Sequence, residues 1–501
     1  MMPRNVLTSE QRYIQETWLD GQVTADVLHD ETTVSVIPGP ADYPNPLPAD
    51  EVGEFQDPQQ RRLVSADDDI VRAFADRGLF PGFLAAGPRE QLRFDPCTVR
   101  AAIVAAGGTA PGTNAAIHAI VRRHGRYVQA AQAAWDAAGR TGDGPACTGQ
   151  VLGIKNGFEG LMAPRGRADV TIPGPVELRP EQTVTWRDLG GCQLGLSRYD
   201  FSAAGRLNQI AQNLLAEKID ILYVIGGDGG MHAALELHNA LRGDPAGKNI
   251  VIAGIPKTMD NDIAWTWQSL GHRTALAEAA RLLDVLHTDA EANRRVILVE
   301  LFGADAGFIA ATAALASGKA DCVLIPEEGF DPWKAAEYVA DRARAQHYAL
   351  VVVAEGALLA LGKYLVSQDL AKLPKPSATG LRDPYYGRQD LRDLALRWMR
   401  DELRAQFIKP PIFTGHVIIS QPGYLIRAVA PGAEDLIAAA RLGDLAVDSA
   451  LAGHSGFMLT QWLTGHVLVP LPLVAKVEKR IARGGIFWRE VASATGQPEL
   501  S

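Results

Sequence analysis

Short apolar runs alternate with amphipathic segments along the chain after about residue 99. The apolar runs are 101–106, 219–225, 249–255, 296–301, 322–325, 348–354 and 416–420. Runs that are short and apolar throughout are typical of parallel strands that are buried on both faces. The helix-like segments between them are 115–123, 231–241, 274–286, 333–346, 388–405 and 433–451. This alternation predicts a doubly wound α/β fold in two lobes.

The composition is that of a large globular protein. Of the 501 residues, 47% are hydrophobic and 21% are charged, which excludes a disordered or fibrous chain. At about 150 residues per domain, the length indicates two or three domains. The formal net charge of −9 argues against a nucleic-acid coat, although arginines can still recognise phosphate at one site. Four cysteines without a CxxC pair favour neither a disulfide framework nor a zinc site.

Neither a targeting segment nor a membrane span is expected. The N-terminus has no apolar run of signal-peptide length, and no uncharged stretch is long enough to cross a bilayer. We therefore expect a cytoplasmic protein. In residues 1–97 acidic side chains outnumber basic ones, and the segment 38–58 holds six prolines. Because proline fixes φ and removes a donor, we interpret 1–97 as an N-terminal extension with an irregular segment.

Three expected strands run into loops that suit phosphate chemistry. The first is followed by Gly107 and Gly108 and then by a helix. Glycines let the backbone approach an anion, and a helix N-terminus offers unpaired N–H groups. The spacing fits neither the dinucleotide fingerprint nor the P-loop, so a plain tight turn stays an alternative here.

The second loop surrounds one carboxylate, Asp228, with four glycines that include Gly229 and Gly230. Each glycine costs roughly 0.5–1 kcal/mol in backbone entropy, so a merely structural turn would rarely keep four. A loop with so little side-chain bulk suits a triphosphate on backbone N–H groups, with Asp228 near its Mg²⁺.

The third loop contains Lys257, Asp260 and Asp262. One carboxylate can take the proton of an acceptor hydroxyl and the other can hold Mg²⁺, while the lysine offsets phosphate charge. An acidic Asx turn is the alternative, but it becomes unlikely when three such loops follow strands of one sheet.

Charged residues elsewhere extend this picture. Arg198 closes a glycine-rich turn. Glu355 directly follows the run 348–354, where it can bond sugar hydroxyls or cap a helix. Arg295 and Arg427 are candidate phosphate clamps, although a single arginine is more often a solvated surface residue.

With these residues assembled, the chain resembles the 6-phosphofructokinase family, and within it the long ATP-dependent branch of plants and trypanosomatids. The motifs GGTAPGTN, LGGCQLGLSR, VIGGDGG, PKTMDNDI, FGADAGF and ARLGDLAVDSALAG occur in the family's order between about 99 and 469. The resemblance implies a donor lobe over 98–270 completed by 429–475, an acceptor lobe over 271–428 and a tail over 476–501. It also implies homodimers or homotetramers that bind Mg²⁺, ATP and a sugar phosphate, with fructose 6-phosphate as the default acceptor.

On the donor side the resemblance assigns roles residue by residue. It places Gly107, Gly108 and Arg198 at the donor phosphates, with Gly230 beside them, and Asp228 at the Mg²⁺. Gly229 stands where pyrophosphate-using members usually carry Asp, whose side chain would block the nucleotide, so the glycine favours ATP. The long ATP branch combines this glycine with Lys257.

On the acceptor side Asp260 matches the catalytic base, Thr258 a transition-state hydroxyl and Asp262 a second acid near the metal. The remaining residues are expected to bind substrate, Arg295 across a subunit interface: Arg295, Phe302, Gly303, Glu355, Tyr424 and Arg427.

Several acceptor-side positions depart from the family. Ala304 and Ile418 replace cations, and two lost arginine–phosphate contacts of roughly 1.5–3 kcal/mol each would weaken binding by about 10²-fold or more. Either Arg273, His272 or His416 compensates, or the acceptor is another sugar, sugar phosphate or nucleoside.

Other readings also stay open. Trp265 and Trp267 can stack on a sugar or base, or pack in the core. A weakly catalytic nucleotide-binding regulatory protein and a pyrophosphate-dependent enzyme are further alternatives. No chemistry is assigned to 361–406, and the tail from 476 is expected to be an interface helix or a frayed end.

Overall fold

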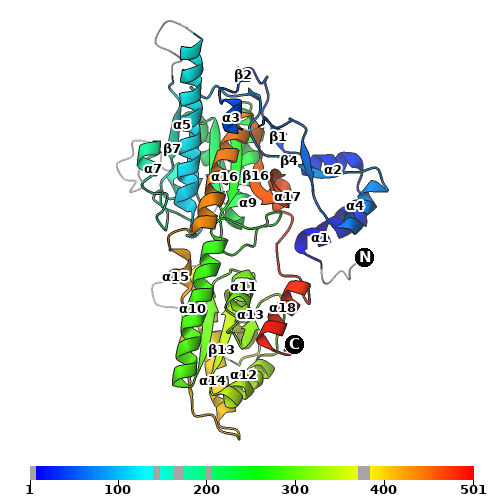
Figure 1. The fold of residues 1–501 in the computed structure, drawn as a ribbon, viewed down its shortest axis with the longest axis vertical. Helices are drawn as coiled ribbons and strands as arrows, with labels where there is room; N and C mark the ends of the chain where they lie inside the picture. Colours follow the sequence, from blue (N-terminus) through cyan, green and yellow to red (C-terminus); the bar gives the residue numbers. More distant parts are fainter. Residues whose placement is uncertain (1–6, 53, 139–146, 163–173, 199–204, 371–383) are drawn as a thin grey trace.

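A computed structural model describes residues 7–52, 54–138, 147–162, 174–198, 205–370 and 384–501. The molecule is elongated, with a larger lobe that contains the N-terminal elements and a smaller lobe below it (Figure 1). Each lobe is built on its own sheet. Part of the segment 361–406, residues 371–383, lies outside the described residues.

The large lobe contains a nine-stranded sheet of mixed direction, as far as the structure describes the chain. Its order is β3 (Arg61–Leu63), β4 (Gly82–Ala85), β17 (Gly465–Pro470), β16 (Phe457–Trp462), β10 (Val251–Pro256), β9 (Ile221–Gly226), β6 (Arg100–Ala105), β7 (Gln150–Gly153) and β8 (Val176–Glu177). The strands from β16 to β7 are parallel, and those at both edges are antiparallel.

Helices cover both faces of this sheet. α5 (Thr113–Ala137) and α16 (Ala433–Leu451) pack together on one face, and α8 (Arg206–Ala216) and α9 (Asp228–Arg242) pack on the other. Successive residues of β6 therefore enter opposite cores, since Ile103 packs on the first face and Val104 on the second. This is why the strand reads as apolar throughout.

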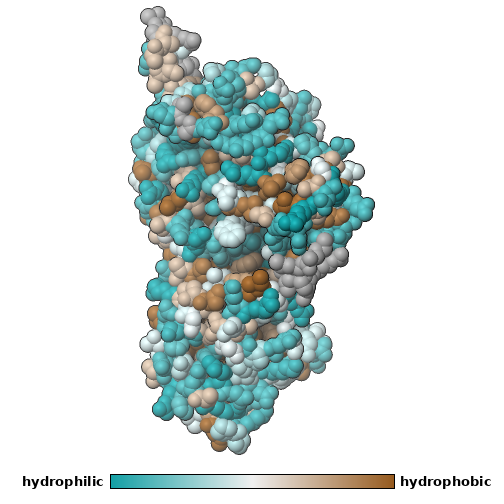
Figure 2. Space-filling view, turned by 45° about the vertical axis from the view of Figure 1, so that its right-hand side comes forward, coloured by the Kyte–Doolittle hydropathy of each residue, from teal (hydrophilic) through white to brown (hydrophobic). Residues whose placement is uncertain are grey.

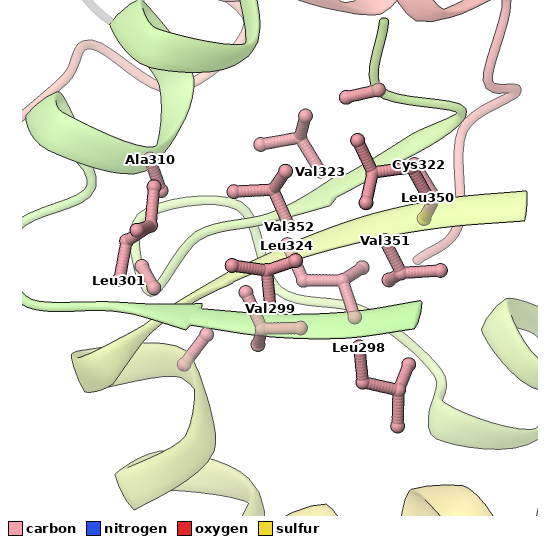
Figure 3. Packing of buried hydrophobic residues seen from close by; sticks show 14 of the residues in the cluster. Leu298, Val299, Leu301, Ala310, Cys322, Val323, Leu324, Leu350, Val351 and Val352 are labelled. Carbon is pink, nitrogen blue, oxygen red and sulfur yellow. The ribbon is translucent and has the colours of Figure 1, made fainter. Parts of the chain in front are cut away.

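The small lobe contains a four-stranded parallel sheet among the described residues. Its order is β12 (Cys322–Leu324), β13 (Ala349–Ala354), β11 (Arg295–Leu301) and β14 (His416–Ser420). The surrounding helices are α10 (His272–Asn293), α11 (Phe308–Ser317), α12 (Pro332–Gln346), α13 (Glu355–Ser367), α14 (Pro384–Phe407) and α18 (Ile486–Thr495). Figure 3 shows valine and leucine side chains of three strands packed close together, with Ala310 of α11 beside them.

The expected two-lobed α/β fold is confirmed, and every strand and helix named from the sequence is present. Most bounds agree within a few residues, but α5 extends well beyond 115–123 and α10 extends beyond 274–286. The antiparallel hairpin of β16 and β17 was not foreseen. Residues 61–85 also do more than link, because β3 and β4 extend the large sheet.

The remaining elements are short. They are α1 (Ser9–Tyr13), η2 (Ile14–Leu19), α2 (Ala25–Thr32), β1 (Ser35–Val36), β2 (Tyr43–Pro44), α3 (Ala49–Val52), α4 (Asp68–Ala75), β5 (Gln91–Leu92), α6 (Glu159–Met162), α7 (Pro180–Thr183), η3 (Gly247–Asn249), α15 (Gly423–Arg427), β15 (His454–Ser455) and α17 (Leu471–Val474). Within the described ranges, no helix has the length and apolar character that a bilayer crossing requires.

Candidate active site

The three predicted loops lie side by side at one edge of the large sheet. They follow β6, β9 and β10, which are neighbouring parallel strands. The carboxyl ends of parallel strands meet at the same edge, where ligands of open α/β sheets bind. The adjacency expected from the sequence is therefore present.

The loop after β6 is tied to the loop after β10 by a buried lysine. The Lys257 ammonium donates hydrogen bonds to the carbonyls of Ala106 at 2.9 Å and Gly108 at 2.6 Å. Gly107 has a φ of +84°, a conformation that L side chains rarely adopt. Burial lowers the pKa of Lys257 to about 8. The lysine thus lies buried behind the glycine loop and holds the shape of that loop.

The expected base, Asp260, is held by the turn that carries it. Its backbone N–H donates to Thr258 Oγ1 at 3.1 Å, and that hydroxyl donates to Asp260 Oδ2 at 3.2 Å. The other carboxylate oxygen, Oδ1, is buried and has no hydrogen-bond partner among the described residues. Burial, followed by the charges of Asp262 and Glu355, raises the pKa of Asp260. An orphaned carboxylate oxygen of this kind suits a group that receives a proton.

The two expected metal ligands come from neighbouring loops. Asp228 begins α9 and its side chain is half exposed, whereas Asp262 is half-buried and its Oδ1 atom is buried without a hydrogen-bond partner among the described residues. Burial and the charge of Asp228 raise the pKa of Asp262. Two carboxylates, one with a free oxygen, fit Mg²⁺, which takes one or two carboxylates and completes its shell with phosphate and water. The structure has no group of three or more potential metal ligands among its described residues.

Space for a ligand opens in front of α9. A Cβ atom built on Gly229 would meet no heavy atom within 4 Å. Its φ lies outside the left-handed region, so neither packing nor backbone conformation demands glycine there. The open space lies at the first turn of the helix, where backbone N–H groups are unpaired.

A cavity of about 600 Å³ joins the two lobes. From the large lobe it is lined by Gly107, Gly108, Thr109, Leu196, Arg198, Met259 and Asp260. From the small lobe it is lined by Phe302, Ala304, Asp305, Glu355, Arg388, Gln389, Arg392, Tyr424 and Arg427. The cavity therefore places the glycine loop and the expected base opposite the expected acceptor residues.

Phe302 is an aromatic residue at the centre of the small-lobe wall of the cavity. The guanidinium of Arg427 lies 5.0 Å from the Phe302 ring centre and 4.7 Å from that of Tyr424. The two rings meet edge to face at 5.4 Å. These contacts hold the Arg427 side chain against the wall of the cavity.

Other expected residues lie outside this cavity. Gly303 sits in the turn between two lining residues, and a Cβ there would come within 2.6 Å of the Ala306 carbonyl. Arg295 lies at the opposite end of β11 from Phe302 and pairs with Asp289 at 3.2 Å. It therefore cannot serve the cavity of its own chain.

The three residues expected to compensate for Ala304 and Ile418 do not line the cavity. His272 is buried and contacts the Met259 carbonyl, and Arg273 pairs with Glu434 near the surface. His416 is the partner of Arg295 at the far end of β14.

The sequence did not show that α14 contributes to the site, although Arg388, Gln389 and Arg392 of this helix line the cavity. The helix itself was predicted, and the two arginines stand four residues apart, on one face. Nothing in that spacing showed which face would meet the site.

The tryptophans beside the base do not face the cavity. Trp265 is fully buried and stacks on Trp18 of the N-terminal segment at 5.9 Å between ring centres. Trp267 is 60% exposed at the surface. Core packing is therefore the role of Trp265.

Comparison with known proteins shows to which family a chain with this arrangement belongs. The family model of phosphofructokinase matches residues 100–450, which is more than half of the chain. This chain belongs to the phosphofructokinase family. The resemblance read from the sequence motifs is thereby confirmed.

Individual relatives of this phosphofructokinase-family chain extend the match. An ATP-dependent 6-phosphofructokinase of Amycolatopsis methanolica is 33% identical over 442 residues, covering 86% of this chain and 87% of that protein. The chloroplastic ATP-dependent 6-phosphofructokinase 4 of Arabidopsis thaliana is 29% identical over 490 residues, covering 96% and 82%.

Solved structures agree on the fold. Phosphofructokinase from Saccharomyces cerevisiae matches with a TM-score of 0.54 and 23% identity over 76% of this chain, which spans only 45% of the yeast chain. A pyrophosphate-dependent phosphofructokinase from Nitrosospira multiformis matches with a TM-score of 0.55 and 20% identity, covering 80% of this chain and 93% of that one.

Proposed function

We propose that this chain is an ATP-dependent 6-phosphofructokinase, which transfers the γ-phosphoryl group of ATP to a hydroxyl of fructose 6-phosphate. The observation that carries the proposal is the cavity between the lobes, where the Gly107–Gly108 loop and Asp260 face Glu355 and Arg427. The relatives named as ATP-dependent 6-phosphofructokinases support the donor and the acceptor.

The donor binds to the large lobe. Its phosphates lie on backbone N–H groups of the Gly107–Gly108 loop and of the first turn of α9, with Arg198 as a cation beside them. The open space at Gly229 favours a nucleotide, because an aspartate at this position would occupy it. Mg²⁺, held by Asp228 and Asp262, supplies positive charge that offsets the donor phosphates when it is bound.

The acceptor binds to the small lobe. Glu355 accepts hydrogen bonds from sugar hydroxyls, and Arg427 and Tyr424 contact the sugar phosphate. Asp260 takes the proton of the attacking hydroxyl at its unpartnered oxygen. Thr258 holds that carboxylate in place, and Lys257 holds the glycine loop.

The proposed division of the chain follows the two binding steps. Residues 98–270 with 429–475 form the donor part and 271–428 the acceptor part. Arg295 lies away from the cavity of its own chain. If it binds the sugar phosphate, it does so in the cavity of a neighbouring subunit, and the protein is therefore an oligomer of at least two copies.

A second candidate is the same phosphoryl transfer to a different acceptor. Ala304 and Ile418 favour it, because neither offers a cation where family members carry one. His272, Arg273 and His416 do not replace those cations in the cavity.

A panel of acceptors with ATP and Mg²⁺ separates the candidates. Fructose 6-phosphate should give the highest kcat/KM among sugars, sugar phosphates and nucleosides. A clear preference for another acceptor would overturn the choice of substrate, and no turnover on the whole panel would indicate a binding protein. The same panel run with pyrophosphate in place of ATP tests the donor.

A further inference from the structure

The small-lobe wall of the cavity contains an ion-pair cluster around Arg392, a residue that lies outside the family motifs. Arg392 of α14 points its Nη1 atom at two carboxylates, at 2.9 Å from Glu300 and 2.8 Å from Glu355. The side chains of Arg392 and Glu300 are 8% and 2% exposed, whereas that of Glu355 is 18% exposed. The cluster is thus buried on one side and open to the cavity at Glu355.

The two carboxylates differ in what else they contact. Glu300 accepts a hydrogen bond from Gln421 Nε2 at 2.6 Å, so it has a partner besides the arginine. Glu355 forms an ion pair with Arg392 and has no hydrogen-bond donor among the described residues, and it lines the cavity. Its remaining lone pairs therefore face the space where an acceptor binds.

Arg392 also faces the cavity itself. Its Nε atom is buried without a hydrogen-bond partner in the described structure. Its guanidinium lies 5.8 Å from the ring centre of Phe302, which Arg427 also contacts. One helical turn earlier, Arg388 lines the cavity and pairs with Asp305 at 2.8 Å. The cations next to Ala304 thus come from α14.

We propose that Arg392 is a positioning and specificity-determining residue of the acceptor site, which holds the Glu355 carboxylate in place and aimed at the acceptor hydroxyls. This rests on the proposed function, in which Glu355 binds those hydroxyls. A charged carboxylate only accepts hydrogen bonds, and this matches hydroxyl groups, which donate them. Arg392 thereby brings a cation to the cavity that Ala304 also lines, where the family carries a cation at position 304.

The first test replaces Arg392 and compares the two substrates. Arg392→Met should raise the KM for fructose 6-phosphate by about 10-fold or more, because Glu355 loses the ion pair that positions it, with the KM for ATP within about twofold. Arg392→Lys keeps a cation and should recover a large part of the increase. Arg397→Met is the matched control, because Arg397 is exposed on the same helix and outside the cavity.

A second variant separates positioning from charge burial. Arg392→Met with Glu300→Gln removes the carboxylate that would otherwise stay buried without a cation, and it keeps the test open if the single variant does not fold. If Arg392 acts through Glu355, the KM for fructose 6-phosphate stays high in the double variant. Recovery of the wild-type KM would show that Arg392 only neutralises Glu300, and would overturn the proposal.

The wild-type arm tests the proposed function independently. An active wild type whose acceptor KM is unchanged in Arg392→Met overturns the role of Arg392 alone. A wild type that does not turn over fructose 6-phosphate overturns the proposed function, and the assignment of Arg392 with it.

Discussion

Gly229 stands beside open space at the start of α9, and it has no side chain that would enter that space. A side chain at this position meets no protein atom, so the glycine is free to vary as far as packing is concerned. The space in front of it is the space that a nucleotide needs in the proposed function. Donor choice can therefore change here without a cost in folding.

Gly229→Asp should abolish most use of ATP while the protein keeps its stability. We expect kcat/KM for ATP to fall by about 10-fold or more, because a carboxylate enters the space of a polyphosphate and repels it. Thermal unfolding should give a Tm close to that of the wild type, since the Cβ has room. Unchanged ATP kinetics would mean that the nucleotide binds elsewhere.

Residues that follow strand ends could be predicted because topology alone brings them together. Gly108, Asp228 and Asp260 belong to this class, since neighbouring parallel strands end at one edge. Arg392 could not be predicted, because its partners Glu300 and Glu355 are remote in sequence and meet it only after α14 has packed. The burial of Trp265 could not be predicted either, since a sequence does not show which side chains of a loop are buried.

Two elements outside the family match support the loop that carries Asp260. In the N-terminal segment, Trp18 stacks on Trp265, and Glu10 accepts a hydrogen bond from the Trp265 backbone N–H at 3.1 Å. The C-terminal strap (475–485) runs between α17 of the large lobe and α18, which packs on α11 of the small lobe (Figure 1). The tail is thus neither frayed nor separate from the site.

Trp18→Ala should destabilise the protein by about 3–5 kcal/mol, because it removes a fully buried indole from an aromatic cluster. Chemical denaturation measures this free energy of unfolding. Trp267→Ala is the matched control, since its side chain is largely exposed and should change stability by about 0.5 kcal/mol or less. Equal effects of the two variants would contradict the packing role of the N-terminal segment.

Lys479 of the C-terminal strap should affect catalysis through the loop. Its ammonium donates to the Thr266 carbonyl at 2.8 Å and lies 5.5 Å from the Phe308 ring centre in the small lobe. Lys479→Met should lower kcat by about tenfold, the equivalent of about 1.4 kcal/mol. Lys476→Met, which removes a surface ion pair with Glu31, should leave kcat unchanged.

The elements that could not be predicted are those whose pairing is remote or antiparallel. β3 and β4 follow the proline-rich segment 38–58. They join the large sheet through the pairing of β4 with β17, which lies almost 400 residues later in the sequence. The parallel strands were predictable because burial on both faces makes them continuously apolar.

In the whole molecule, the carboxyl ends of strands from both sheets face one cavity between the lobes. The outer surface of the molecule is largely hydrophilic in the face shown in Figure 2, with apolar side chains gathered in smaller patches. The cavity residues come from loops of both sheets and from α13, α14 and α15, so the site exists only when both lobes are folded and placed against each other.

Buried histidines should make the stability of the whole molecule depend on pH. Burial lowers the pKa of His124 to about 3, below the value of about 6.5 that it has when unfolded. Because the folded pKa is depressed, His124 loses its stabilising contribution as pH falls below about 6.5. The loss continues toward pH 3, at about 1.4 kcal/mol per pH unit.

The variant His124→Gln isolates this effect, because buried acids such as Asp448, whose pKa is raised to about 6, act in the opposite direction in both proteins. The free energy of unfolding of the wild type minus that of the variant should fall by about 2 kcal/mol between pH 7 and pH 5. A difference that does not vary with pH would contradict a neutral buried imidazole.

The most direct test of the account is the activity of Asp260→Asn with ATP, Mg²⁺ and fructose 6-phosphate. Asparagine preserves the shape of the side chain and cannot accept the hydroxyl proton. We predict that kcat falls by about 10²-fold or more, with the KM for ATP within about twofold. A kcat close to that of the wild type would contradict the central claim that Asp260 activates the acceptor between the two lobes.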